Sequence, residues 1–175
     1  PMNAVLELTP TQRAELFTAA SQALGLGPII VEKDFWVCWT LGQLFTLPDL
    51  GEHLIFKGGT SLSKIWRAID RFSEDIDISI SRDWLGFGGA KDPEKATSGK
   101  KQRRGLDDLS AACAQKTRDE LLPRLQERAR AALGDTGWLI EVDEADLQTL
   151  HFRYPTTFQE TMAPYIVRAV KIEGG

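Results

Sequence analysis

The sequence is poor in cysteine and has no long apolar run. Only two cysteines occur in 175 residues. Cys38 and Cys113 lie in segments of helical composition without the spacing of metal ligands, so we expect reduced thiols and a cytoplasmic protein. No apolar run approaches the roughly 20 residues that a transmembrane helix needs. The first residues also lack a signal-peptide pattern, which argues against secretion.

A surplus of positive charge is also absent. The chain has 21 Lys and Arg against 25 Asp and Glu, a net charge of −4, and its isoelectric point is near 5.3. This balance argues against a protein that binds nucleic acid over its whole surface, so any RNA contact must come from a restricted face. Hydrophobic residues at 42% and charged residues at 26% are typical of soluble globular proteins.

The length of the chain predicts a single domain over residues 1–175. The first part, 9–46, is expected to be helical. The second part, 52–175, is expected to form a mixed or antiparallel sheet flanked by helices, so the predicted class is α+β. The chain stops directly after an expected core strand, and we therefore also expect it to be the N-terminal fragment of a longer protein.

Hydrophobic periodicity and turn residues predict the individual elements. Trp36 and Trp39 belong to a helix that is apolar around most of its circumference, so they are expected in the core rather than in a base-stacking platform. Pro123 is expected to break or kink a later helix. The expected helices are 9–24, 31–45, 60–69 and 106–133, and the expected strands are 54–56, 75–80, 138–142, 149–154 and 165–172.

A glycine turn and a strand with two carboxylates carry most of the functional information. Asp75 and Asp77 are alternate residues of the expected strand, so both side chains project from one face while the isoleucines point into a core. Two such carboxylates repel each other, and a bound Mg²⁺ relieves the repulsion by bridging them to phosphate oxygens. The turn at 57–61 offers backbone N–H groups where a triphosphate can lie.

Each of these features also has an ordinary structural explanation. A Gly-Gly turn or an Asp-x-Asp pair alone occurs by chance in many proteins. Asp75 could pair with Arg71 or Arg82 in a surface salt bridge of little energetic value. The combination is less easily accidental, because the glycines follow one apolar strand, open a helix and precede two acids on a second apolar strand.

These residues resemble the signature of the AbiEii/AbiGii group of nucleotidyltransferase toxins, within the DNA polymerase β-like superfamily. The upstream run 31–37 also resembles that group, and the run 170–173 stands where its strand with the third acid is expected. The resemblance therefore covers most of the chain. It is carried most specifically by Phe56, Lys57, Gly58, Gly59, Thr60, Ser61, Leu62, Ser63, Lys64, Arg71, Phe72, Ser73, Glu74, Asp75, Ile76, Asp77 and Ile78.

The resemblance implies three catalytic acids and a set of nucleotide-binding residues. Gly58 and Gly59 match the glycines of the nucleotide-binding turn, and an anion is favoured where the following helix begins. Ser73 and Lys171 each lie two residues before an acid and would share its face. The implied catalytic and metal-binding residues are Asp75, Asp77 and Glu173. The implied nucleotide-binding residues are Lys57, Gly58, Gly59, Thr60, Ser61, Lys64, Ser73 and Lys171.

The resemblance further implies an enzyme that uses two Mg²⁺ ions to transfer NMP from an NTP to a hydroxyl, with release of pyrophosphate. The acceptor would be RNA, such as a tRNA 3′ end, or a protein. The chain would be the toxin of a type IV toxin–antitoxin pair in phage defence by abortive infection, with a cognate antitoxin. Two alternatives stay open: a catalytically incomplete nucleotide-binding or antitoxin-binding module, and a phosphotransferase or nuclease that uses the same acids.

One dense basic cluster, formed by Lys100, Lys101, Arg103 and Arg104, has two interpretations. It follows a polar, glycine-rich connection, so it can be the solvated end of a loop. It can also be an arm that holds the triphosphate of an NTP or the phosphate backbone of RNA. The sequence leaves both interpretations open.

Overall fold

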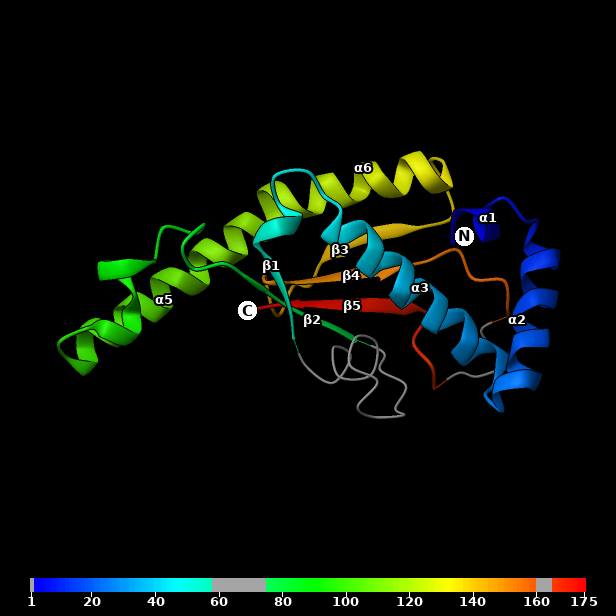
Figure 1. Ribbon diagram of the computed structural model, residues 1–175, viewed down its shortest axis with the longest axis horizontal. Helices are drawn as coiled ribbons and strands as arrows, with labels where there is room; N and C mark the ends of the chain where they lie inside the picture. The colour runs from blue at the N-terminus through cyan, green and yellow to red at the C-terminus, as the bar shows by residue number, and fades with distance from the viewer. Residues whose placement is uncertain (1, 58–74, 160–164) are drawn as a thin grey trace.

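The computed structural model describes residues 2–57, 75–159 and 165–175, and it shows an open five-stranded sheet with helices packed against it (Figure 1). The predicted α+β class with a helical N-terminal region is confirmed. The helices are α1 (Met2–Leu6), α2 (Pro10–Leu24), α3 (Pro28–Phe45), α5 (Gly99–Lys116) and α6 (Leu122–Leu133), with single turns η1 (Gly51–His53), η2 (Gly89–Lys91), η3 (Pro93–Lys95) and η4 (Thr117–Leu121). The strands are β1 (Leu54–Lys57), β2 (Asp75–Ile80), β3 (Leu139–Val142), β4 (Thr149–Arg153) and β5 (Ala169–Gly174).

The sheet is mixed, with the strand order β1-β2-β5-β4-β3. β2 and β5 run parallel, and the other neighbouring pairs run antiparallel. The parallel pair places Asp75 beside Lys171 and Asp77 beside Glu173. Residues from the middle and the end of the chain therefore meet in the centre of the sheet.

α2 begins and ends where the sequence predicts. α3 begins at Pro28, earlier than the predicted start at 31, because proline fits the first helical position, and α1 was not predicted. The Thr9 hydroxyl accepts the N–H of Gln12, and the Gln12 side chain accepts the N–H of Thr9, which forms a capping box at the start of α2. Trp36 and Trp39 of α3 are 0% and 1% exposed, so their predicted place in the core is confirmed. In the described ranges no single helix has the length and apolar character of a membrane span, although α2 and α3 together meet that criterion across a 104° bend.

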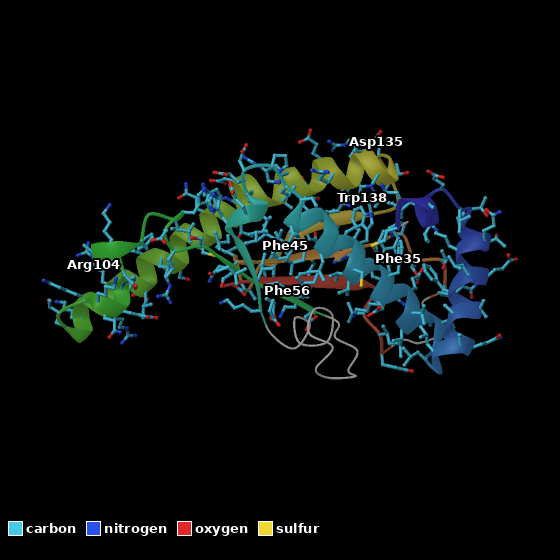
Figure 2. The ribbon with its side chains drawn as sticks, in the orientation of Figure 1. Phe35, Phe45, Phe56, Arg104, Asp135 and Trp138 are labelled. Carbon is cyan, nitrogen blue, oxygen red and sulfur yellow. The ribbon has the colours of Figure 1, made fainter. Side chains whose placement is uncertain are left out.

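One face of the sheet forms the core together with α3 and α6. Ile76, Ile78 and Ile80 of β2 are buried there, and each alternates with a residue that is exposed or half-buried. The ring of Phe45, at the end of α3, lies 6.0 Å from the ring of Phe56 on β1 (Figure 2). The opposite face carries polar side chains of the same strands, and we call it the polar face: Lys57, Asp75, Asp77, Ser79, Thr149, His151, Lys171 and Glu173.

The predicted start of the last strand, at residue 165, is wrong. β5 begins at Ala169 instead, and it continues to Gly174. Tyr165 and Val167 are 84% and 68% exposed, so these apolar side chains add nothing to the core and their backbone has no partner strand among the described residues. The helix predicted at 60–69 lies outside the described residues.

The helix predicted at 106–133 begins earlier, at Gly99, because the Ser98 side chain caps it by accepting the N–H of Lys101. A break or kink was predicted at Pro123, and the helix is irregular directly before it: α5 ends at Lys116, the π-helical turn η4 follows, and α6 begins at Leu122. Pro123 lies in the first turn of α6, directly after the π-helical turn η4, where a missing N–H does not interrupt the helix. The basic cluster therefore lies in the first turns of α5 and not at the end of a loop, and Arg104 projects at the far end of this helix (Figure 2).

Gly174 permits a close approach between β5 and the segment before β4. Its N–H donates to the Gln148 carbonyl oxygen at 3.0 Å, and a Cβ on Gly174 would lie 2.6 Å from that oxygen. Gly174→Ala is expected to lower the free energy of unfolding by about 1–3 kcal/mol, because backbone atoms must move apart. Urea unfolding measures this difference.

Gly42→Ala is the matched control for this prediction. Gly42 lies in α3, and a Cβ added there would have no neighbouring atom within 4 Å, so alanine should stabilise the helix by about 0.5–1 kcal/mol. Equal effects of the two substitutions would contradict the observed register at the end of β5.

Candidate active site

Polar side chains form two adjacent rows across the polar face. Each row joins residues that are direct neighbours on adjacent strands. The first row is Lys57, Asp77, Glu173 and Thr149. The second row is Asp75, Lys171, His151 and Glu141. The prediction that Asp75 and Asp77 share one face is confirmed, and Glu173 and Lys171 lie on that face as well.

Asp77 and Glu173 are in contact across the β2–β5 pair. The pKa of Asp77 is raised, mainly because burial desolvates its carboxyl, and further because it shares a hydrogen bond with Glu173 and lies near the charges of Glu173 and Asp75. The pKa of Glu173 is lowered, mainly by a hydrogen bond from Lys171. Such a pair marks a position where a cation would relieve electrostatic repulsion.

Lys171 connects the two rows. Its ammonium group forms an ion pair with Glu173, and this hydrogen bond is the main reason that the pKa of Lys171 is raised. The charge of Asp75, its neighbour on β2, raises the pKa further. The positive charge of Lys171 thus lies among the carboxylates of Asp75, Asp77 and Glu173, on the face predicted from the sequence.

A cavity of about 520 Å³ adjoins the first row. Ile55 and Ser79, which line it, lie two residues along their strands from Lys57 and Asp77. α5 contributes a stripe of inward side chains, Leu106, Leu109 and Cys113. This cavity was not predicted from the sequence. The i, i+3 and i+7 spacing of the stripe does indicate a helix face that packs toward the rest of the protein.

A comparison with protein families identifies the chain. The model of one family, described as nucleotidyl transferase AbiEii toxin of a type IV toxin–antitoxin system, matches residues 39–175. The match covers more than half of the chain and includes β1, β2 and β5. The chain belongs to the AbiEii family. It is therefore a nucleotidyltransferase toxin of a type IV system, which implies a cognate antitoxin. No curated protein and no solved structure matches the chain.

Several residues that the AbiEii resemblance singled out lie outside the described residues. They are Gly58, Gly59, Thr60, Ser61, Lys64 and Ser73. Lys57, the last described residue before them, ends β1 beside Asp77. Of the two salt bridges that would explain Asp75 as a surface residue, the one with Arg71 also falls outside this range, and Arg82 pairs with Asp92 and Glu94.

The polar face of this AbiEii protein carries the donor atoms that Mg²⁺ prefers, since carboxylate oxygens are hard ligands. Within 2–57, 75–159 and 165–175, no group of three or more His, Cys, Asp or Glu side chains is arranged to hold a metal ion. Asp77 and Glu173 fit an ion as an adjacent pair, with Asp75 two residues along the same strand. Glu173 would have to loosen its ion pair with Lys171 to offer both oxygens to an ion.

Both histidines make contacts within the fold. The ring of His53 stacks on Trp84 with the ring centroids 4.8 Å apart. His151 Nε2 lies 2.7 Å from a carboxylate oxygen of Asp143. The pKa of Asp143 is lowered, mainly by this hydrogen bond. Cys38 and Cys113 form no disulfide, and burial raises the pKa of Cys113.

Proposed function

We propose that this AbiEii protein is an Mg²⁺-dependent enzyme that transfers NMP from an NTP to a hydroxyl of RNA, such as a tRNA 3′ end, or of a protein. The observation that supports this most is the contact between Asp77 and Glu173 on neighbouring parallel strands, with Asp75 on the same face. Neighbouring carboxylates repel each other, and a cation bound among them would offset this electrostatic cost.

The proposed reaction is a displacement at the α-phosphorus of the NTP. The acceptor oxygen forms a bond to this phosphorus, the bond to the bridging oxygen breaks, and pyrophosphate leaves with the electron pair. The acceptor proton passes to solvent. When bound, two Mg²⁺ ions would neutralise charge on the phosphates and lower the pKa of the acceptor hydroxyl. Asp75, Asp77 and Glu173 would hold these ions.

The cationic side chains of the polar face would orient the nucleotide. Lys57 ends β1 at the residue before Gly58, so it is proposed to contact the phosphates together with the glycine turn. Lys171, displaced from Glu173 when an ion binds, would turn its ammonium group to a phosphate oxygen. The other proposed nucleotide-binding residues are Gly58, Gly59, Thr60, Ser61, Lys64 and Ser73.

The biological setting we propose is abortive infection, in which the toxin arrests growth during phage attack. Cys38 and Cys113 are not joined in a disulfide, which fits a cytoplasmic location. The basic cluster in the first turns of α5 makes no ion pair with another described residue, so its charge is available to an RNA backbone.

Incubation with each α-labelled NTP, Mg²⁺ and total RNA or cell protein tests the proposed reaction. Label should appear in an acceptor with one pyrophosphate released for each transfer, and EDTA should abolish both signals. Nucleotide binding without transfer would favour a catalytically incomplete module instead. Acceptor cleavage without pyrophosphate would indicate a nuclease.

A further inference from the structure

The cavity beside the first row has the position of a subsite within the proposed active site. Asp77 and Ser79 are alternate residues of β2, so they project from the same face roughly 7 Å apart along the strand. Gly175 follows Glu173 at the same spacing, directly after the end of β5, and it also lines the cavity. A group held by the acids can therefore extend directly into this space.

The direction of β1 separates the cavity from the proposed phosphate site. β1 runs antiparallel to β2, with Ile55 opposite Ser79 and Lys57 opposite Asp77. The chain thus passes the cavity first and reaches Lys57, beside Asp77, second. If Lys57 contacts the phosphates as proposed, the α-phosphate lies near the acids and the nucleoside points back toward Ile55 and Ser79.

The lining of the cavity suits a flat, amphipathic ligand. Ile55 and Leu106 are 56% and 42% exposed, and both line this cavity. The side chains of Ser110 and Gln148 supply polar atoms, and the Gln148 amide donates to the Ser110 hydroxyl at 3.0 Å. Charged groups of Lys57, Arg82 and Asp83 also line the cavity, so its walls combine aliphatic and polar surface, and small-molecule sites of this volume bind ligands with both kinds of group.

We infer that this cavity, between the ends of β1 and β2 and the face of α5, is the pocket for the base and ribose of the NTP. This inference rests on the proposed function. Leu106 and Leu109 would cover the faces of the base, and Ser110 and Gln148 would contact its edge. α5 is therefore assigned a specificity-determining role, distinct from the charge of its first turns.

Binding of a non-hydrolysable NTP and of inorganic tripolyphosphate, each with Mg²⁺, tests the assignment with Leu109→Trp, which fills the cavity. We expect Leu109→Trp to weaken NTP binding at least about 10-fold and to leave tripolyphosphate binding unchanged. The control is Leu147→Trp, because Leu147 is 55% exposed and lines a different cavity. It should bind both ligands as the wild type does.

The outcomes separate this inference from the proposed function. If the wild type binds neither ligand, the proposed function fails. If Leu109→Trp binds NTP normally but labels no acceptor, the cavity receives the acceptor and the inference is overturned. If circular dichroism shows that Leu109→Trp is unfolded, Leu106→Ala replaces it in the test. Leu106 is partly exposed on a helix surface, so its truncation should leave the protein folded. It should weaken NTP binding by about 10-fold, and unchanged NTP binding would overturn the assignment.

Discussion

Asp77→Asn is expected to reduce nucleotidyl transfer by at least about 1,000-fold. The substitution keeps the shape of the side chain but removes a negative charge from the contact with Glu173. A metal carboxylate contributes several kcal/mol to stabilisation of the transition state, and each 1.36 kcal/mol corresponds to a factor of ten in rate. Asp75→Asn should have an effect of similar size. The measurement is the rate of label transfer at saturating NTP.

The same substitution should not destabilise the fold. Desolvation and the neighbouring charges of Glu173 and Asp75 raise the pKa of Asp77, so a neutral residue there removes repulsion. We expect Asp77→Asn to unfold at the same temperature as the wild type or a higher one. The matched control is Asp135→Asn, since the side chain of Asp135 is 82% exposed and pairs with Arg130. A transfer rate within tenfold of the wild type for Asp77→Asn would remove this residue from the mechanism.

Glu32→Ala is expected to lower the free energy of unfolding by about 3–5 kcal/mol. Glu32 of α3 is 0% exposed and accepts hydrogen bonds from the hydroxyls of Thr156 and Thr157 and from the N–H of Thr157, at 2.7–2.9 Å. One of its oxygens also lies 3.8 Å from the guanidinium of Arg168, whose side chain is 9% exposed. Removal of the carboxylate leaves the Arg168 charge buried without this partner. A chain of this size should lose roughly 10 °C in melting temperature.

A double variant distinguishes the charge pair from general packing. Replacement of a buried ion pair by apolar residues is often neutral, so Arg168→Met should restore part of the stability that Glu32→Ala removes. Glu52→Ala is the surface control, because the side chain of Glu52 is 74% exposed. If Glu32→Ala melts within about 2 °C of the wild type, the cluster does not fix the connection between β4 and β5 to α3.

The alternating pattern of β2 was predictable because strand periodicity is local. Isoleucines at every second position specify a buried face, and the residues between them must face the other way, so Asp75 and Asp77 were correctly placed together. The capping box at Thr9 is local as well. Each of these patterns lies within one helix or strand, and tertiary contacts do not change the local structure that it predicts.

Contacts between distant segments could not be predicted in the same way. The hydrogen bonds of Glu32 join residues 124 and 125 positions apart, and the cavity joins β1 and β2 to α5. The early start of α5 was missed because Gly99 and Gly105 resemble loop residues, yet Ser98 provides a cap. The prediction that the last strand begins at residue 165 was wrong, because apolar composition alone does not show which residues have a partner strand.

A crystal structure with Mg²⁺ and a non-hydrolysable NTP tests the central claim most directly. We expect an ion bound by the carboxylates of Asp77, Asp75 and Glu173 at about 2.0–2.1 Å, with the α-phosphate in contact with the same ion and Lys171 turned away from Glu173. An NTP bound elsewhere on the chain, with no ion at Asp77 and Glu173, would contradict the account.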